Sequence, residues 1–316
     1  MDVRQVLPAD TIPSVDDPVF DEDYEGDATD RVVVVDSPDR PRAYPLRYLH
    51  YHEIVNDTVD GEPLAVTWCP LCGSAVVYER TVDGQILEFG VSGKLADDDL
   101  VMYDRETESE WKQSSGRCIA GTHDGRELTV RPAAILTWEE FEAAYSDGVV
   151  LQPPGGESEA ASADDTPSEI EYDSSPYDAY FESDGFGLGA HRGDGDPREW
   201  DREDLSPKAV VLGLELDGEA LAFPLSRVLD GGGVVQTTVG SRDVVVFATD
   251  TDGIHAFVDP GYEFTVTDGT VRGDGTSWNP ATGEGDDGRR LDRLPARRLF
   301  AFAWQDDHGP DVFFEP

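Results

Sequence analysis

Hydrophobic residues between positions 31 and 105 occur in short runs that are rich in β-branched and aromatic side chains. Gly, Asp and Pro separate these runs, which is typical of turns between strands. The pattern predicts a mainly β fold of the α+β class, with few short helices. The runs are RVVVVDS (31–37), LAVTW (64–68), SAVVYER (74–80), ILEFGVSG (86–93) and LVMYDR (100–105).

Two segments follow a helical period instead. In 45–57 (PLRYLHYHEIVND), leucine and isoleucine side chains recur at positions that would share one helix face. In 136–145 (LTWEEFEAAY), Thr137 followed by Glu139 and Glu140 is typical of a helix start. We expect one short helix in each segment.

The second half of the chain repeats the first in a degraded form. The stretch DRPRAYPLRYL (39–49) is answered by DGEALAFPLSRVL (217–229), in which an aromatic-Pro-Leu sequence again leads into an apparent helix. The likeness predicts an internal duplication, with a first strand-rich repeat at 12–152. A connecting loop and the second repeat would occupy 171–316. Between them, 153–170 is rich in Pro, Gly, Ser and acidic residues, which predicts a disordered insertion.

The composition is strongly acidic, with 67 Asp and Glu against 24 Lys and Arg and a formal charge of −43. Such a chain repels itself in dilute buffer, whereas molar salt screens the repulsion. Acidic residues are spread along the sequence and lysines are few, which favours a halophilic protein over one with an acidic patch for a basic partner. Nucleic acid is excluded as a partner, because no basic stripe is present to neutralise phosphates.

The sequence also indicates a compartment. The N-terminal stretch MDVRQVLPADTIPSV lacks the basic and apolar regions of a signal peptide. No apolar run approaches the roughly 20 residues of a membrane helix, so a membrane partner is not expected. Three cysteines, an odd number, do not make a disulfide framework. We expect a cytoplasmic protein with reduced thiols.

Cys69 and Cys72 form the strongest chemical motif, within TWCPLCGSAVVYER (67–80). Two intervening residues allow both sulfurs to reach one metal ion or each other. A redox dithiol usually has its first thiolate at a helix N-terminus, whereas β-branched residues follow Cys72 and predict a strand. Metal binding, dithiol exchange and plain packing all remain open from the motif alone.

A metal site requires further ligands. His52 is the best third candidate, and Met102 is the only methionine besides the initiator. The expected metal is soft or borderline, either copper or zinc. A thioether beside the thiolates would favour cuprous copper over zinc. Cys118 and His123 complete the candidates, although Cys118 fits a packing role.

A second group of functional candidates lies in MYDRETESEW (102–111). Asp104, Arg105, Glu108 and Trp111 would line a polar cleft that binds a small molecule or a protein. The alternative is an ion-pair network that only fixes a turn. The preceding DDD run at 97–99 lacks the Gly and Glu of a calcium loop and predicts a solvated turn.

Several of these blocks resemble the family known as domain of unknown function 3179. The likeness runs from residue 12 to the C-terminus, except for 153–170, and it implies no reaction. The blocks are YPLRYLHYHEIVND, VTWCPLCGSAVVYER and FGVSGKLADDDLVMYDRETESEWKQSSG, with weaker likeness in VLGLELDGEALAFPL and LFAFAW.

The residues themselves therefore carry the functional hypothesis. We expect a soft or borderline metal, copper or zinc, to be bound by Cys69, Cys72, His52 and Met102. In a first alternative the protein is a thiol-disulfide oxidoreductase, with Cys69 as attacking thiol and Cys72 as resolving thiol. In a second it is a non-catalytic module that binds a small molecule or protein.

Overall fold

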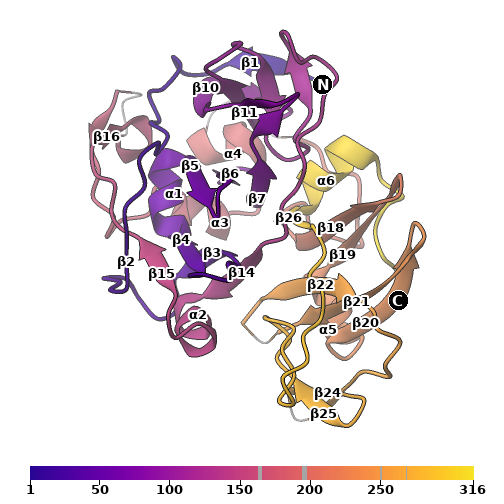
Figure 1. Cartoon of the computed structure of the whole chain (residues 1–316). Helices are drawn as coiled ribbons and strands as arrows, with labels where there is room; N and C mark the ends of the chain where they lie inside the picture. Colours follow the sequence, from indigo (N-terminus) through magenta and orange to yellow (C-terminus); the bar gives the residue numbers. More distant parts are fainter. Residues whose placement is uncertain (163–165, 194–197, 250, 268) are drawn as a thin grey trace.

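The computed structural model of the chain describes residues 1–162, 166–193, 198–249, 251–267 and 269–316. Strands dominate this part of the chain, and its six α-helices have eight residues or fewer. The mainly β prediction is confirmed. Figure 1 shows the first half of the sequence as one strand-rich body and the second half as another beside it.

One sheet of the first half explains the run of four valines at 32–35. Both faces of its strand β3 are buried, with two valines packed in each of two hydrophobic clusters. The helix α2 (Trp138–Ala144) follows β14 and begins with a capping box between Thr137 and Glu140, which confirms the predicted helix start. The strand order is β14 (Ala134–Thr137), β3 (Arg31–Val35), β4 (Arg42–Pro45), β15 (Val149–Leu151), β2 (Phe20–Asp21).

A six-stranded sheet joins the two halves. The junction is narrow, because Arg298 of β26 pairs with Ala75 of β7 as the one residue pair in its register. The backbone N–H of Phe300 also donates to the carbonyl of Cys72 over 2.7 Å. The C-terminal strand therefore lies directly against the CxxC turn (Figure 1). The strand order is β19 (Glu219–Pro224), β18 (Val210–Leu216), β26 (Arg297–Phe300), β7 (Ser74–Glu79), β6 (Glu62–Cys69), β5 (Ile54–Val59).

The helix predicted at 45–57 is shorter than expected. Helix α1 spans Leu46–His52, and Glu53 ends it at φ 58° with its N–H on the carbonyl of Leu49. The prediction is wrong beyond this point, because the β-branched Ile54 and Val55 are fully buried in β5 and pair with β6.

A third sheet, in the first half of the chain, contains the N-terminal strand β1. Its hairpin of β10 and β11 turns at Asp97 and Asp98, both at positive φ, as in the tight turns that match strand twist. The strand predicted at 86–93 is divided between the short hairpin of β8 (Thr81–Val82) and β9 (Gln85–Ile86) and the beginning of β10. The order is β1 (Val3–Gln5), β10 (Phe89–Ala96), β11 (Asp99–Asp104), β12 (Glu110–Lys112), β13 (Cys118–Ala120).

The second half has the same order of elements as the first: a hairpin, a short helix, then three antiparallel strands. Pro45 and Pro224 precede the two helices with nearly equal dihedrals, φ −62° in both and ψ 128° and 127°. The internal duplication itself stays a prediction. The remaining elements here are α5 (Leu225–Asp230), β20 (Val234–Val239), β21 (Arg242–Ala248), β22 (Ile254–Val258), β23 (Thr265–Thr267), β24 (Thr270–Gly273), β25 (Thr276–Trp278) and α6 (Ala301–His308).

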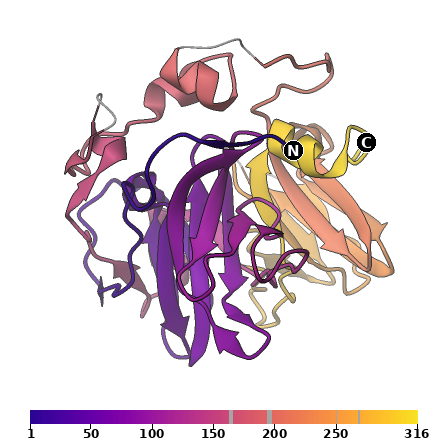
Figure 2. The same cartoon turned by 90° about the horizontal axis from the view of Figure 1, so that it is seen from above.

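The connecting segment lies across one side of both halves (Figure 2). Part of the insertion predicted to be disordered, 163–165, lies outside the described residues, and its flanks form a short hairpin. Tyr177, Tyr180 and Phe186 of the following stretch are buried in the same hydrophobic cluster as the CxxC cysteines. The elements are β16 (Glu157–Ser158), η1 (Glu159–Ala161), β17 (Ser168–Glu169), α3 (Asp178–Glu182) and α4 (Gly187–Arg192).

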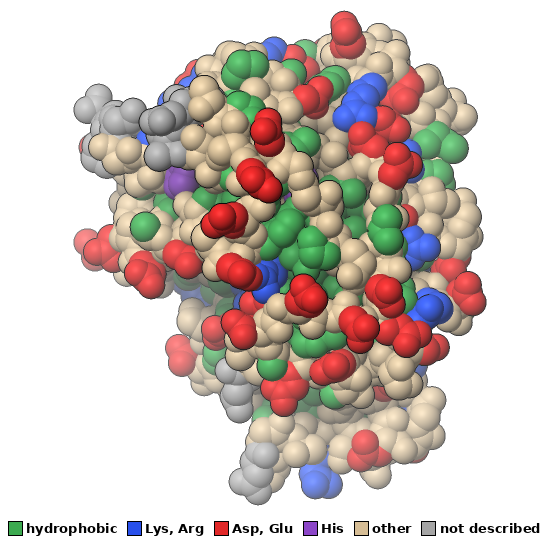
Figure 3. Space-filling view, turned by 90° about the vertical axis from the view of Figure 1, so that its left-hand side faces the viewer, with side chains coloured by type: hydrophobic (Ala, Val, Ile, Leu, Met, Phe, Trp, Pro, Cys, Tyr) green, Lys and Arg blue, Asp and Glu red, His purple; other side chains and the backbone are tan. Residues whose placement is uncertain are grey.

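Acidic side chains are scattered over the face shown in Figure 3 and surround a central strip of hydrophobic side chains. This distribution fits the even spread of acids in the sequence. Within the described residues, none of the helices combines the length and apolar character needed to cross a membrane.

Candidate metal centre

Cys69, Cys72 and Asp99 bring one ligand atom each into a common group. The two sulfurs and a carboxylate oxygen all lie within 4.8 Å of one another, and all three side chains are buried. Cys69 is the last residue of β6, and Cys72 follows in the turn to β7. Asp99 comes from a different sheet, as the first residue of β11. The two sulfurs therefore lie close enough together to contact one ion.

The turn between the cysteines is fixed by its neighbours. Gly73 lies at φ 55°, and a Cβ there would come within 2.7 Å of the Phe300 ring. Its N–H donates to the carbonyl of Pro70 over 3.3 Å. Glycine is required at this position because a side chain would need both a left-handed backbone and space that Phe300 occupies. The turn thus holds Cys72 in position without help from a metal.

Asp99 has one bonded and one unbonded oxygen. Oδ2 accepts from the backbone N–H of Ser114 over 2.9 Å. Oδ1 is buried and has no hydrogen-bond partner among the residues described. Burial raises the pKa of Asp99, and the positive charge of Lys112 opposes this rise. Burying a carboxylate oxygen without a partner is unfavourable in free energy, and a proton or a cation bound to this atom would remove that penalty.

The charge of Lys112 acts on Asp99 and Cys72, but its ammonium is bonded to another carboxylate. Its ammonium lies 2.6 Å from Asp307 and 3.9 Å from Asp97. Burial alone would lower the pKa of Lys112, but the charges of Asp307 and Asp99 outweigh burial and raise the pKa above its ordinary value. The lysine charge is therefore matched by Asp307, which leaves Asp99 and the thiols free to receive a separate cation.

The cysteines are poorly suited to redox chemistry as free thiols. Burial raises the pKa of both Cys69 and Cys72. The strand β7 follows Cys72, so no helix N-terminus stabilises a thiolate here. A reactive dithiol needs a thiol that is exposed to its substrate and that ionises readily. Cys69 and Cys72 are buried and have raised pKa values, so without a bound ion they meet neither condition.

A small cavity of about 80 Å³ adjoins Cys69. Leu71, Tyr177 and Leu100 supply apolar walls, and the Glu53 side chain is also at this cavity. Burial raises the pKa of Glu53 to about 8, and the neighbouring carboxylates of Glu159 and Asp99 add to the rise. The cavity has room for a few water molecules beside the sulfur.

His52 is not part of the sulfur and carboxylate group. Its Nδ1 lies 2.9 Å from the carbonyl oxygen of Pro13, and its Nε2 lies 2.7 Å from the hydroxyl of Tyr172. Both ring nitrogens are therefore occupied by hydrogen bonds that fix the end of α1. The sequence places His52 just before β5, but its ring is held by Pro13 and Tyr172 and is not in the group with Cys69 and Cys72.

Met102 lies three residues along β11 from Asp99. Side chains alternate between the faces of a strand, so Met102 points to the face opposite that of Asp99. There it is fully buried and pairs with Trp111 across the sheet. Its part as a weaker fourth ligand stays a prediction.

The four residues predicted to line a polar cleft mainly fix a turn. Asp104 is fully buried and accepts from the indole N–H of Trp111 over 2.9 Å and from Thr107 over 2.7 Å. Trp111 is fully buried as well, whereas Arg105 is paired with Asp16 over 2.6 Å at the surface.

Glu108 takes a positive φ of 55° and donates its N–H to the carbonyl of Asp104. These contacts correspond to the alternative interpretation of the sequence, a network that fixes a turn. The cleft itself stays a prediction.

Cys118 and His123 are not part of the group formed by Cys69, Cys72 and Asp99. The Cys118 thiol donates to the carbonyl of Ala120 over 3.3 Å, and burial raises its pKa. The His123 ring packs against Trp111 at 5.7 Å between centroids. Cys118 therefore has the packing role that its sequence context suggested.

Sequence reasoning missed Asp99, because it treated the DDD run as a solvated turn. Asp97 and Asp98 do form the turn, but Asp98 and Asp99 are buried, at 6% and 1% exposure. The available signal was the position of Asp99 at the start of a hydrophobic run, where a strand leads back into the core.

Comparison with known proteins supports the resemblance seen in the sequence. No curated protein and no solved structure matches the chain significantly. One family does match, over residues 9–311, and its description is "Protein of unknown function (DUF3179)". Because this match covers nearly the whole sequence, the chain belongs to the DUF3179 family.

Proposed function

We propose that the protein binds a zinc ion through Cys69, Cys72 and Asp99. The observation that carries this proposal is the buried, unpartnered Oδ1 of Asp99 in a group whose ligand atoms lie within 4.8 Å of one another. Thiolate sulfur and carboxylate oxygen are both ordinary zinc ligands. A carboxylate is a hard ligand that cuprous copper does not favour, so zinc suits this set better than copper.

The geometry requires only a small contraction on binding. Zinc–sulfur bonds of about 2.3 Å in a tetrahedron place neighbouring sulfurs about 3.8 Å apart. The atoms of the group would close by about 1 Å from their present limit of 4.8 Å. Rotation of the two cysteine side chains can bring the sulfurs this much closer while the backbone of the turn stays in place.

The electrostatics also favour a dication. Two thiolates and one carboxylate carry three negative charges in a buried place, which the protein without metal avoids by raised pKa values. A zinc ion reduces this charge to one negative unit. Binding would therefore release the protons held by the thiols, and the affinity for zinc would rise with pH.

Three protein ligands leave a fourth position for an exchangeable ligand. The cavity beside Cys69 can hold water at this position. Zinc sites with three protein ligands and an open position are typical of catalysis, whereas closed sites with four are structural. The expected zinc is therefore exchangeable and reachable through the cavity.

Zinc titration of the reduced protein against a chromophoric chelator tests the proposal. We expect one equivalent to bind, with affinity lowered by at least about 100-fold in Cys69→Ser and Cys72→Ser and by about 10- to 100-fold in Asp99→Asn. Cys118→Ser removes the third thiol and is the matched control, with unchanged affinity. Equal affinities in Cys69→Ser and the unaltered protein would refute the proposal, as would the absence of binding.

The same titration tests the two further ligands expected from the sequence. Met102→Leu would lower the affinity if the thioether completes the site, and His52→Gln would do so if the imidazole does. Because both nitrogens of His52 are hydrogen-bonded, we expect His52→Gln to leave zinc affinity unchanged.

A further inference from the structure

A cavity of about 600 Å³ lies where the two halves and the connecting segment meet. This cavity lies on the opposite face of the six-stranded sheet from the proposed zinc site. Trp68, one of its walls, directly precedes Cys69, and neighbouring residues of a strand point to opposite faces. Its volume is in the range of small-molecule sites, roughly 300–1,000 Å³.

Two of the four cations around this cavity have structural partners. Arg47 is paired with Asp30 at 3.2 Å and with Asp173 at 2.9 Å. Lys208 donates to the carbonyl oxygens of Tyr180 and Ser183 at the end of α3, where it completes the helix. The charges of Arg47 and Lys208 are thus engaged in holding the cavity wall.

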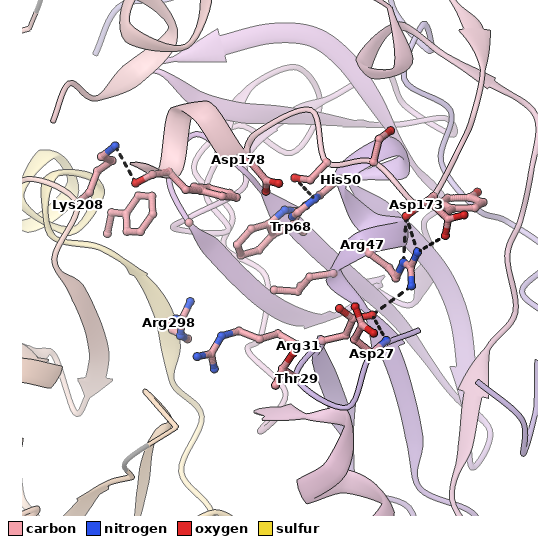
Figure 4. A pocket seen from close by; sticks show the side chains of 18 residues that line it. Asp27, Thr29, Arg31, Arg47, His50, Trp68, Asp173, Asp178, Lys208 and Arg298 are labelled. Atoms are coloured by element: carbon pink, nitrogen blue, oxygen red, sulfur yellow. Dashed lines mark hydrogen bonds and ion pairs between the residues drawn. The ribbon is translucent and has the colours of Figure 1, made fainter. Parts of the chain in front are cut away.

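The other two cations, Arg31 and Arg298, are different. Arg31 donates to the carbonyl of Thr251 over 2.8 Å, and its ion pair with the exposed Asp252 is long, at 3.8 Å. Among the described residues, the Arg298 guanidinium has no hydrogen-bond or ion-pair partner, and its Nε is buried. Figure 4 shows the Arg31 side chain reaching across the cavity toward Arg298.

Two guanidinium groups so close together are unfavourable without an anion. Burial lowers the pKa of Arg298 and the charge of Arg31 lowers it further, whereas the charge of Asp252 opposes this shift without reversing it. A buried charge without a partner is destabilising, whereas one oxyanion can pair with two guanidinium groups at once. In a chain with a charge of −43, two neighbouring guanidinium groups stand out when the exposed Asp252 is the one carboxylate paired with either of them among the described residues.

Four aspartates also line the cavity, and two of them are the partners of Arg47. One stretch of the wall is aromatic. Trp68, Phe181 and Phe300 line it, and the indole N–H of Trp68 is buried without a partner among the described residues. The His50 ring is stacked on Trp68 at 6.0 Å between centroids. Burial lowers the pKa of His50 to about 4, so its ring is neutral at pH 7. The cavity therefore has a cationic end and an aromatic wall.

We propose that this cavity binds a small organic anion, with its carboxylate or phosphate group between Arg31 and Arg298 and its flat apolar part against Trp68. Guanidinium groups recognise both kinds of oxyanion through paired hydrogen bonds. The aromatic wall provides contact area for a ring or an unsaturated chain and excludes water from the ion pair. The site lies at the junction of the two halves, so its occupant would contact both.

Isothermal titration of the full-length protein with phenyl phosphate and with benzoate tests this proposal. At one fixed ionic strength, we expect at least one of them to bind saturably, and the neutral benzyl alcohol to bind at least about tenfold more weakly. The phosphate and benzoate arms distinguish the two oxyanions. Absence of saturable binding by both aromatic anions would overturn the proposal, as would inorganic phosphate binding as tightly as phenyl phosphate.

The variants Arg298→Gln and Arg31→Gln identify the site. Each should weaken binding of the aromatic anion by about 10- to 100-fold, because a charged hydrogen bond is lost. Arg298 has no hydrogen-bond or ion-pair partner in the described part of the chain, so Arg298→Gln should fold with unchanged or raised stability, and its zinc affinity should be unchanged. Arg40→Gln, at an exposed arginine paired with Glu22, is the control. Unaltered anion affinity in both pocket variants would contradict the assignment.

Discussion

Replacing Lys112 by Met is expected to lower the free energy of unfolding by about 3–5 kcal/mol, because it removes a buried cation that pairs with Asp307 and opposes the charge of the buried Asp99. Lys112 is 4% exposed, and its ammonium lies 2.6 Å from Asp307. Asp307 also accepts from the hydroxyl of Ser114 over 2.6 Å, so it remains held in place when the lysine is gone. Urea unfolding of the metal-free protein, followed by circular dichroism, measures the loss.

The double variant Lys112→Met with Asp307→Asn is the control. Asparagine keeps a hydrogen-bond acceptor for Ser114 without a charge, so much of the lost stability should return. Equal destabilisation in the single and double variants would show that Lys112 contributes through packing of its alkyl chain and not through its charge.

Replacing Glu53 by Gln is expected to stabilise the metal-free protein at pH 9 by about 3–5 kcal/mol, while leaving its stability near pH 4 almost unchanged. The Glu53 side chain is 7% exposed, and its folded pKa is about 8 against an ordinary value of 4.5. Below pH 4.5 the folded and unfolded chains both carry the proton. Between pH 4.5 and 8 only the unfolded chain releases it, so stability falls as pH rises.

The measurement is the difference in unfolding free energy between Glu53→Gln and the unaltered protein, from pH 4 to pH 9 in the presence of a chelator. The difference isolates Glu53 from the many other carboxyl groups that titrate. Glu62→Gln is the matched control, because this glutamate begins β6 with partial exposure and pairs with Arg131 at 3.3 Å. A pH-independent difference for Glu53→Gln would contradict the raised pKa.

The strands were predictable because their side chains carry a local signal. The four valines of β3 and the β-branched residues of β6 and β7 lie buried where the sequence expected strands. The helix at 45–57 was overestimated because its period continues into Ile54. Only the pairing of β5 with β6, a tertiary contact, shows that Ile54 belongs to a strand.

The candidate site was predictable only in its sequence-local part. Cys69 and Cys72 are three positions apart, so a turn brings their sulfurs together. Asp99 reaches them from another sheet, and no local pattern indicates that contact. His52 is close in sequence, but its ring is held by Pro13 and Tyr172, and Tyr172 is 120 residues away.

The cavity at Arg298 could not be predicted for the same reason. Arg31 and Arg298 stand at opposite ends of the chain and meet only because β26 joins the six-stranded sheet beside β7. In the sequence each is one arginine among several. The halophilic character and the cytoplasmic location remain predictions from composition, which the fold does not test.

X-ray absorption at the zinc edge of the zinc-loaded, reduced protein tests the central claim most directly. The account predicts a mixed first shell, with two sulfurs at about 2.3 Å and lighter oxygen or nitrogen ligands at about 2.0–2.2 Å. Cys69→Ser should lose one sulfur from this shell. A first shell without sulfur in the unaltered protein would contradict zinc binding by the CxxC turn.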